Sequence, residues 1–312
     1  IINNKTYVIA SDGDLMEGIS HEAMSLAGHL KLKNLIVFFD NNKISIDGST
    51  SLSVSDNYKK RFESYGWNFL EVNGHNEKQI SKTISKASKS NKPTIISCKT
   101  IIGFGSPNKS GKASSHGSPL GDDEIILVRK KLKWSNKPFE TPQEILDEWK
   151  KIGEKGEELE KKWLETINKK NPKIKSDLEK NYINSDLVEL EKLIEKEKTK
   201  YFGTKPSLAT RQCSMAAIES ISSILPQLIG GSADLSGSNN TKTNNSKIIN
   251  SKNFNGNYIH YGVREHGMAA IMNGLALYGG IVPYGGTFLI FSDYCKPSIR
   301  LSALMGLKVI YI

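Results

Sequence analysis

The sequence predicts an α/β protein built on open parallel sheets, and two observations lead to this prediction. Short, continuous apolar runs recur at residues 7–10, 35–39 and 94–98, and such runs are typical of strands in a buried parallel sheet. Stretches with helical spacing separate these runs, as they do in β-α-β units. The alternation therefore favours a parallel sheet with helices packed on its faces.

Each predicted element has a local reason. After the strand at 7–10, apolar residues recur at helical spacing, at Ile19, Ala23, Ala27 and Leu30. A second helix is predicted over 79–89, before the strand at 94–98. The stretch 103–121 is rich in Gly, Ser and Asn and is too long for an ordinary connection, so we expect a functional or disordered loop there.

The region 141–200 is rich in Lys and Glu and predicts amphipathic helices packed on the surface. Apolar residues recur there at helical spacing, at Leu159, Trp163 and Ile167 and again at Leu187, Leu190 and Ile194. A second α/β segment begins near residue 207. We expect it to contain a helix at 210–225, a turn at Gly230–Gly231, a strand at 258–261 and a helix at 265–277.

The composition argues against some classes of partner. The formal net charge is +10, but residues 151–200 carry 13 Lys against 10 Glu and 2 Asp, a mixed-sign surface rather than a basic stripe for nucleic acid. There is no run of eighteen apolar residues, so we expect no membrane span. The cysteines, Cys98, Cys213 and Cys295, are far apart in sequence. This favours buried thiols in a reducing compartment, which we take to be the cytoplasm, over a disulfide framework.

Asp12 and Asn42 are predicted to meet at one edge of the first sheet. Asp12 is expected to end one strand and Asn42 to end the next, 42 − 12 = 30 residues later, which is the length of one β-α-β unit. Ligands of open parallel sheets bind beyond the carboxyl ends of the strands. A carboxylate and an amide oxygen there suit Mg²⁺ or Ca²⁺, and Gly13 before a helix suits a phosphate. The alternative is a strand-end turn and a loop that bind nothing.

Longer blocks of sequence give these residues a family context. Asp12-Gly13 followed by Asn42 resembles the fingerprint of thiamine-diphosphate enzymes. The blocks 16–22 (MEGISHE), 42–48 (NKISIDG), 98–109 (CKTIIGFGSPNK), 115–121 (SHGSPLG), 230–235 (GGSADL) and 261–268 (YGVREHGM) resemble transketolase in content and order. They span nearly the whole chain, and only the charged region is generic.

The resemblance implies two thiamine-diphosphate-binding-type parallel-sheet domains, both incomplete, joined by a charged helical linker. Residues 1–135 would belong to the pyrophosphate-binding domain, 136–206 to the linker and 207–312 to the pyrimidine-binding domain. Both ends of the sequence look like breaks within strands. We therefore expect an internal fragment of a longer protein, which alone would be inactive.

The resemblance also implies a set of metal and diphosphate ligands. Asp12, the side chain of Asn42 and the main-chain carbonyl of Ile44 would hold the Mg²⁺ or Ca²⁺ that binds the cofactor diphosphate. Gly13 would contact that diphosphate. The sequence departs from the family at Ser11, where Gly is usual.

Carboxylates and one histidine complete the implied cofactor site. Glu17, near the cofactor, and Glu22 would join a carboxylate network close to a dimer interface. Glu265 would be the main catalytic carboxylate and would hydrogen-bond the cofactor's pyrimidine ring, although its position alone indicates a partner of a helix N-terminus. His116 would contact the diphosphate and the substrate and could move a proton, although alone it reads as an exposed loop residue. Asp234 would lie near the cofactor.

The remaining implied residues lie in the second domain. Phe291, with Phe288 and Tyr294, would form the aromatic pocket for the aminopyrimidine ring. Arg211 and Ser238 would bind the phosphate end of the sugar. On spacing alone, the three aromatic residues would form one face of a helix, and Arg211 would be a surface charge.

Taken together, the resemblance implies a transferase of the pentose phosphate pathway. It would move a two-carbon ketol unit from a ketose phosphate to an aldose phosphate with thiamine diphosphate, as a homodimer. One alternative is an enzyme like 1-deoxyxylulose-5-phosphate synthase. The block at 98–109 and the residues around His116 favour transketolase over this alternative. The other alternative is a non-catalytic, transketolase-like fragment.

Overall fold

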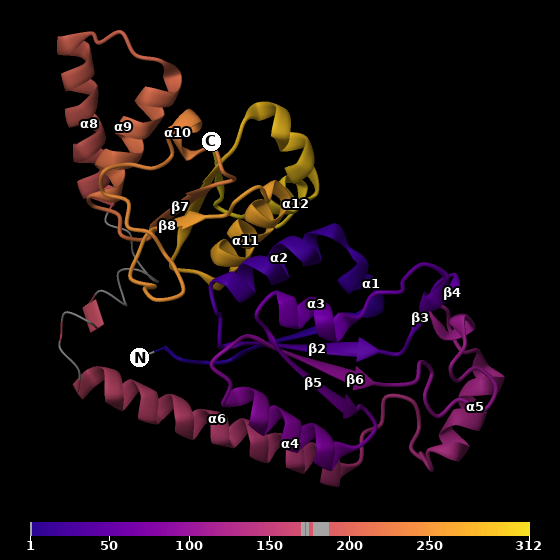
Figure 1. The fold of residues 1–312 in the computed structure, drawn as a ribbon. Helices are drawn as coiled ribbons and strands as arrows, with labels where there is room; N and C mark the ends of the chain where they lie inside the picture. The colour runs from indigo at the N-terminus through magenta and orange to yellow at the C-terminus, as the bar shows by residue number, and fades with distance from the viewer. Residues whose placement is uncertain (1, 170–171, 173–174, 177–186) are drawn as a thin grey trace. The chain divides into compact units, whose positions relative to one another are not determined.

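The computed structural model of the chain describes residues 2–169, 172, 175–176 and 187–312, which fall into two units (Figure 1). Unit 1 is Ile1–Lys170 and unit 2 is Asn171–Ile312. Each unit is built around a four-stranded sheet whose paired strands run parallel. The predicted α/β class with parallel sheets is therefore confirmed.

Unit 1 follows the predicted β-α-β order. Its sheet has the order β1-β2-β6-β5, with β1 at Thr6–Ser11, β2 at Leu35–Asn41, β5 at Asn68–Asn73 and β6 at Thr94–Lys99. A small hairpin of β3 (Ile44–Ser45) and β4 (Gly48–Ser49) follows β2. The helices are α1 (Asp12–Met16), α2 (Gly18–His29), α3 (Tyr58–Ser64), α4 (Glu77–Ser88), α5 (Asp122–Lys131) and α6 (Gln143–Lys169), with short 3-10 helices η1 (Thr50–Leu52) and η2 (Ala113–Ser115).

Different helices cover the two faces of this sheet, with α2 and α3 on one side and α4 on the other (Figure 1). Successive side chains of a strand point to opposite faces. Phe39 of β2 therefore packs with Ala27 of α2 and Phe62 of α3. The preceding residue, Phe38, packs with Ile36 and Ala87 on the α4 side. Alternate side chains of the apolar run in β2 thus belong to two hydrophobic cores, one on each face of the sheet.

The edge strand β1 is less buried than the strands beside it. Ala10 is buried, but Ile9 is 82% exposed. Ile9 stands beside Phe38 in the register and so faces the α4 side, where the packed helix residues contact β2, β5 and β6. The apolar run at 7–10 therefore forms a strand as predicted, but within it only Ala10 is buried.

All four strands of the parallel sheet in unit 1 end at the same edge. The register pairs Ser11 with Asp40, Asp40 with Cys98, and Cys98 with Val72. Helix α1, the segment after β2 and the segment after β6 all start from this edge. Because parallel strands present their carboxyl ends together, residues distant in sequence come close there.

Unit 2 has a sheet of order β10-β9-β7-β8. Its strands are β7 (Leu228–Ser232), β8 (Tyr258–His260), β9 (Val282–Gly286) and β10 (Ile310–Tyr311). Its helices are α8 (Leu187–Thr204), α9 (Thr210–Ser222), α10 (Ser236–Asn239), α11 (Glu265–Tyr278) and α12 (Ser292–Leu304), with the 3-10 helix η3 (Leu289–Phe291) before α12. A buried cluster joins Ile218 of α9 to Leu228 of β7 and Tyr284 of β9.

The prediction of a turn at Gly230–Gly231 is wrong, because both glycines lie inside β7. They are needed there because aromatic rings occupy the space of their missing side chains. A Cβ on Gly230 would lie 1.7 Å from Cζ of Tyr284, and a Cβ on Gly231 would lie 2.2 Å from Cε2 of Tyr261. A glycine pair within a strand thus marks a close approach by neighbouring groups.

The three cysteines are free thiols, but they are not all buried. Cys295 is buried, Cys98 is half-buried and Cys213 is exposed. The expectation of thiols without disulfides is therefore confirmed, whereas the expected burial is wrong for Cys213, which lies near the exposed start of α9.

The Lys- and Glu-rich region contains α6 and α8, so its helical character is confirmed where the structure describes it. Residues 170–171, 173–174 and 177–186 lie outside the described residues. Along α6 the exposed fraction falls from 66% at Leu159 to 38% at Trp163 and 5% at Ile167, so the predicted apolar stripe is buried only toward its end. The boundaries at 135 and 206 stay predictions.

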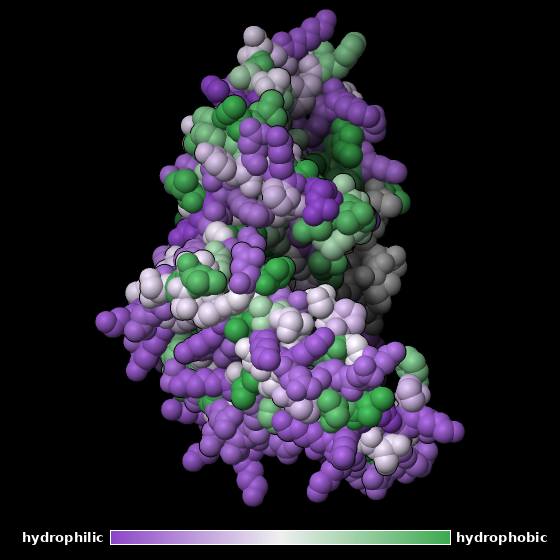
Figure 2. All heavy atoms as spheres, turned by 90° about the vertical axis from the view of Figure 1, so that its right-hand side faces the viewer, coloured by the Kyte–Doolittle hydropathy of each residue, from purple (hydrophilic) through white to green (hydrophobic). Residues whose placement is uncertain are grey.

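The surface of unit 1 on the side of α5 is mostly hydrophilic, with hydrophobic side chains in small, separate groups (Figure 2). One exposed apolar side chain of α5 is Ile126, at 63% exposure. Among the described residues, no helix combines the length and the apolar character that a bilayer span requires.

We expect Gly230→Ala to lower the free energy of unfolding by about 1–3 kcal/mol, the usual cost of overpacking, because the ring of Tyr284 must move. The matched control is Gly274→Ala. Gly274 lies in α11 with no neighbouring atom within 4 Å of its Cβ position, so alanine there should be neutral or stabilise by up to about 1 kcal/mol. Chemical denaturation measures both variants. A Gly230→Ala variant as stable as wild type would contradict the packing argument.

Candidate functional site

The two predicted metal-ligand segments of unit 1 meet at the carboxyl edge of its sheet. Asp12 starts α1 directly after β1, and its side chain is 2% exposed. Its Oδ2 accepts a hydrogen bond of 3.1 Å from the backbone N–H of Lys43. In the same segment, Oδ1 of Asn42 accepts a hydrogen bond of 2.9 Å from the backbone N–H of Ile44. The strand ends therefore converge as the spacing predicts, and the metal role of these groups stays a prediction.

The electrostatics of Asp12 fit a cation. Burial raises the pKa of the Asp12 carboxyl, while backbone hydrogen bonds from Lys43 and Asn42 act in the opposite direction. None of the ion pairs found among the described residues involves Asp12. A buried carboxylate without a counter-ion is costly, and a hard divalent ion would remove that cost. The amide oxygen of Asn42 still has a second lone pair to offer.

The described residues at this edge of the sheet do not form a metal site made of clustered acidic and imidazole side chains. Within the described part of the chain, no three His, Cys, Asp or Glu side chains gather in a way that could hold a metal. A cation beside Asp12 would therefore depend on amide, carbonyl and ligand oxygens for its other contacts. That donor set suits Mg²⁺ or Ca²⁺ bound together with a diphosphate.

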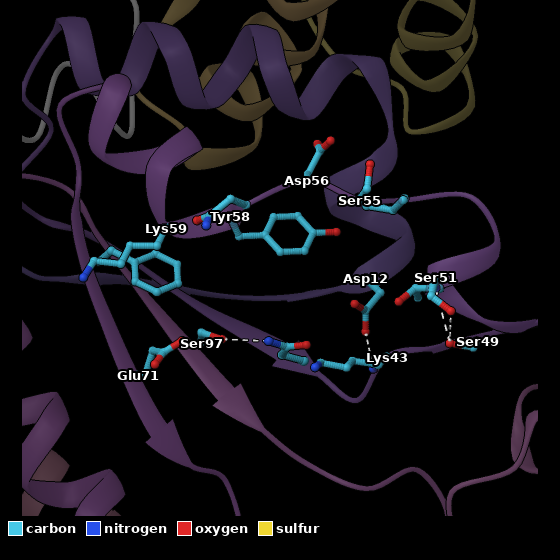
Figure 3. Close-up of a pocket in the computed structure, with 15 residues that line it drawn as sticks. Asp12, Lys43, Ser49, Ser51, Ser55, Asp56, Tyr58, Lys59, Glu71 and Ser97 are labelled. Carbon is cyan, nitrogen blue, oxygen red and sulfur yellow. Dashed lines mark hydrogen bonds between the residues drawn. The ribbon is translucent and has the colours of Figure 1, made fainter.

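A cavity of about 450 Å³ opens beside Asp12 (Figure 3). Most of its lining side chains are polar and come from the strand ends and from residues 49–59. The hydroxyl of Tyr58 points to the part of the cavity where Asp12 and Ser55 lie (Figure 3). That hydroxyl is buried and has no hydrogen-bond partner among the described residues, and burial, followed by the charge of Asp12, raises its pKa. The wall of the cavity thus contains a donor that these residues leave unused.

Ser11, which departs from the resemblance, has a clear local role. Its φ of −99° and ψ of 178° are extended backbone that any residue adopts, so glycine is not required. Its side chain caps α1: Oγ donates to Oδ2 of Asp14 at 2.8 Å, and Oγ also accepts from the Asp14 N–H at 3.4 Å. The N–H of Ser11 donates to the same Asp14 oxygen at 2.7 Å. This reciprocal capping holds the first turn in which Asp12 stands.

Gly13, Glu17 and Glu22 lie on the segment that follows. Gly13 is inside α1 rather than before a helix, and only Oγ of Ser11, at 3.9 Å, comes near its Cβ position. Packing therefore does not demand glycine, which leaves room for a ligand. Glu17 is exposed between α1 and α2, and Glu22 is half-buried on α2. Their predicted roles beside the cofactor and in an interface stay predictions.

His116 lies in the long loop after β6. Its Nδ1 is buried and finds no hydrogen-bond partner in the part of the chain that the structure describes, while its backbone N–H donates to the carbonyl of Ala113 at 2.8 Å. An imidazole nitrogen left unpaired in a buried place is the kind of group that a bound polar ligand satisfies. Internal hydrogen bonds hold the loop, so the disordered alternative is wrong for it, and its functional role stays a prediction.

Glu124, which the sequence analysis did not single out, closes this loop from α5. Its carboxylate accepts hydrogen bonds from the hydroxyl of Ser106 and, at 2.9 Å each, from the backbone N–H and side-chain Nδ2 of Asn108. These bonds, that of Ser106 foremost, lower the pKa of Glu124 to about 2. The signal in the sequence was weak, because Glu124 reads as one of three acidic residues in the first turn of a helix.

Two further polar groups that the sequence analysis missed hold the site in place. The guanidinium of Arg61 on α3 donates to the carbonyl of Leu15 at 2.7 Å and to Oγ of Ser20 at 3.1 Å, which ties α3 to the α1–α2 corner. Asp40 at the end of β2 accepts from the hydroxyl of Thr100, just after β6. Spacing in the sequence does not indicate either contact, because Thr100 follows Asp40 by 60 residues and Arg61 follows Leu15 by 46 residues.

In unit 2, Glu265 begins α11 and is 9% exposed. The three predicted aromatic residues form a stack at the start of α12. The ring centroids of Phe288 and Phe291 are 6.1 Å apart at 16°, and those of Phe291 and Tyr294 are 6.1 Å apart at 22°. Phe288 is 43% exposed and Tyr294 61%, so flat faces remain accessible for stacking. The aromatic set is thus brought together, although its ligand stays a prediction.

Asp234, Arg211 and Ser238 are exposed residues of unit 2. Asp234, two residues after the end of β7, has a left-handed φ of +61°, an uncommon conformation for an aspartate. Arg211 lies in the first turn of α9 and Ser238 in α10. The structure does not bond these three residues to one another, and their predicted binding roles stay predictions.

Comparison with known proteins gives both halves of the chain a family. A model described as "Transketolase, thiamine diphosphate binding domain" matches residues 1–186, and one described as "Transketolase, pyrimidine binding domain" matches residues 206–312. The chain is 49% identical to the transketolase of Buchnera aphidicola over 318 residues and 46% identical to that of Sinorhizobium medicae over 312 residues. These matches take in 100% of this chain but 47% and 45% of the relatives, so the chain spans about half their length.

Solved structures resemble the fold equally well. A transketolase from Campylobacter jejuni matches with a TM-score of 0.89 and 37% identity, over 99% of this chain and 47% of its own. A transketolase from Pichia stipitis in complex with sedoheptulose-7-phosphate matches with a TM-score of 0.89 and 35% identity, again over 99% and 47%. The parallel-sheet architecture of this chain is thus one that solved transketolases contain.

We expect Ser11→Ala to lower the free energy of unfolding by about 1 kcal/mol, because the side-chain cap of α1 is lost. Ser11→Gly, the residue that the resemblance suggests, should cost only a few tenths of a kcal/mol. Urea denaturation of both variants beside wild type measures the order. If Ser11→Gly were the more destabilising of the two, the capping role of Ser11 would be wrong.

Proposed function

The chain belongs to the transketolase family, and we propose that the protein transfers a two-carbon ketol unit from a ketose phosphate to an aldose phosphate. We propose that it does so with thiamine diphosphate and a divalent cation, Mg²⁺ or Ca²⁺. The observation that carries this proposal is the meeting of Asp12 with the segment Asn42–Ile44. A buried carboxylate at the carboxyl edge of a parallel sheet, with no ion pair in the described part of the chain, is what a metal-bound diphosphate needs.

In this proposal the first unit binds the diphosphate end of the cofactor. Asp12, Oδ1 of Asn42 and the carbonyl of Ile44 hold the cation, and the open space beside Gly13 admits a phosphate oxygen. His116 supplies its unpaired Nδ1 to the diphosphate or the substrate. Thiamine diphosphate supplies the chemistry of C–C bond cleavage and formation when it is bound. The residues of the chain orient it, exclude water and hold protons.

The second unit binds the pyrimidine end of a cofactor and the sugar, at a site that the pyrophosphate domain of the other subunit completes. Glu265 is buried at the start of α11 and holds a proton at the pyrimidine ring. The Phe288–Phe291–Tyr294 stack offers flat apolar faces to that ring. Arg211 and Ser238, both exposed, bind the phosphate end of the sugar, with the guanidinium fork suited to a phosphate. Asp234 lies near the cofactor.

The partners in this proposal are sugar phosphates and a second copy of the protein. The Pichia stipitis structures that this chain resembles include complexes with xylulose-5-phosphate and sedoheptulose-7-phosphate, which supports sugar phosphates as the substrate class. A homodimer, to which Glu17 and Glu22 contribute, follows from the family resemblance. Free cysteines on three separate elements, β6, α9 and α12, support a reducing compartment such as the cytoplasm.

The test uses the full-length protein, with a ketose phosphate and an aldose phosphate, in the presence and absence of thiamine diphosphate and Mg²⁺. We expect turnover that needs both, and a loss of about 10²–10⁴-fold in kcat for Glu265→Gln, since a proton-holding group is replaced. Glu63→Gln, which changes an exposed carboxylate of α3, is the matched control and should keep wild-type turnover.

Turnover without thiamine diphosphate, or an unimpaired Glu265→Gln variant, would contradict the proposal. Absence of any ketol transfer by the full-length wild type would favour the non-catalytic alternative.

A further inference from the structure

The loop that carries His116 is fastened by a buried carboxylate that has no role in the proposed chemistry. Glu124 is 7% exposed, and its oxygens accept from Ser106 and twice from Asn108. All these donors belong to the segment just before the His116 turn. The carboxylate is therefore engaged with the loop rather than with solvent.

A continuous chain of hydrogen bonds leads from Glu124 to the residue beside His116. Oγ of Ser106, which donates to Glu124, accepts from the backbone N–H of Lys109 at 2.9 Å. The carbonyl of Lys109 accepts from Oγ of Ser115 at 2.6 Å. Ser115 directly precedes His116. A displacement of Ser106 would therefore move Lys109, whose carbonyl accepts the hydrogen bond from Ser115, the residue before His116.

The same loop is closed across its base. Nζ of Lys109 donates to the carbonyl of Leu120 at 2.8 Å, which ties the start of the loop to its end. Gly103 has a φ of +62°, and a Cβ there would lie 2.7 Å from Oγ of Ser115, so the two arms of the loop pass in close contact. The position of His116 therefore depends on how the segment 103–109 is held.

A simpler role for Glu124 would be a favourable negative charge at the N-terminus of α5, but two other acidic residues already supply that charge. Asp122 and Asp123 stand in the same first turn of α5 and are exposed. Either can interact with the helix dipole without being buried. What distinguishes Glu124 is its set of loop donors.

We propose that Glu124 is a positioning residue for His116: it holds Ser106 and Asn108, and through Lys109 and Ser115 it fixes the loop that presents the imidazole. This inference rests on the proposed function for the part that concerns cofactor and substrate. The fastening of the loop itself is independent of that function.

The first experiment measures the loop alone. Lys109 and Lys112 are trypsin sites within it, so limited proteolysis of the full-length protein reports its opening. We expect Glu124→Ala to be cleaved there at least about tenfold faster than wild type, because all the acceptor bonds are lost. Glu124→Gln, which keeps an acceptor oxygen, should resist cleavage nearly as well as wild type. Asp123→Ala, in the same helix turn, is the matched control and should be unchanged.

The second experiment asks whether Glu124 acts through His116. Calorimetry gives the affinity for thiamine diphosphate with Mg²⁺, and steady-state assays give kcat and KM. We expect Glu124→Ala to weaken cofactor affinity and to lower kcat/KM by about 10–100-fold, as a misplaced binding group does. In a His116→Ala background the same change should have little further effect on either quantity, because the group that it positions is gone.

Wild-type loop cleavage in Glu124→Ala would overturn the proposal. So would a loss of affinity that is equally large with and without His116. If Glu124→Ala fails to fold by circular dichroism, Asn108→Ala, which removes one donor from an exposed position, carries the same two tests. If Glu124→Ala is cleaved faster but the wild type shows no ketol transfer, the role of Glu124 in holding the loop is supported and the proposed function is contradicted.

Discussion

The arrangement of unit 1 depends on the buried carboxylate of Asp12, which forms no ion pair with the residues that the structure describes. Asp12 is 2% exposed, and burial raises its pKa. A raised carboxyl pKa contributes stability below the ordinary value of 3.8 and loses it as the pH rises through the folded-state value. The ionised form of Asp12 is therefore a cost that other interactions must offset, and a cation beside it would remove that cost.

The surrounding structure keeps this carboxylate in place despite its cost. Ser11 caps the turn that contains it, and the guanidinium of Arg61 fastens the α1–α2 corner to α3 through two charge-assisted hydrogen bonds. On the other side, the backbone of Lys43 donates to Asp12 from a segment that the β3–β4 hairpin continues. The site is thus built on strand ends and short, capped turns, which makes it rigid before a ligand arrives.

The sequence predicted those elements and site residues whose signal lies in neighbouring residues of the chain, and it missed those that depend on distant ones. Apolar runs and helical spacing gave β1, β2, β6, α2 and α4, and the distance from Asp12 to Asn42 indicated that their strand ends converge. The segments α3 and β5 were not predicted, because β5 is an edge strand of mixed polarity that becomes recognisable only beside β6. Gly230–Gly231 was misread as a turn, because the rings that exclude side chains there belong to Tyr261 and Tyr284, far along the chain. Glu124 was missed for the same reason, since its partners precede it by 16 to 18 residues in an irregular loop.

The most direct test of the central claim is a crystal structure of the full-length protein grown with thiamine diphosphate and Mn²⁺, with anomalous scattering used to locate the ion. The account predicts one anomalous peak about 2.0–2.6 Å from a carboxylate oxygen of Asp12, Oδ1 of Asn42 and the carbonyl oxygen of Ile44, with the diphosphate completing its coordination. An ion bound elsewhere, with the Asp12 carboxylate still unpaired beside the occupied cofactor, would contradict it.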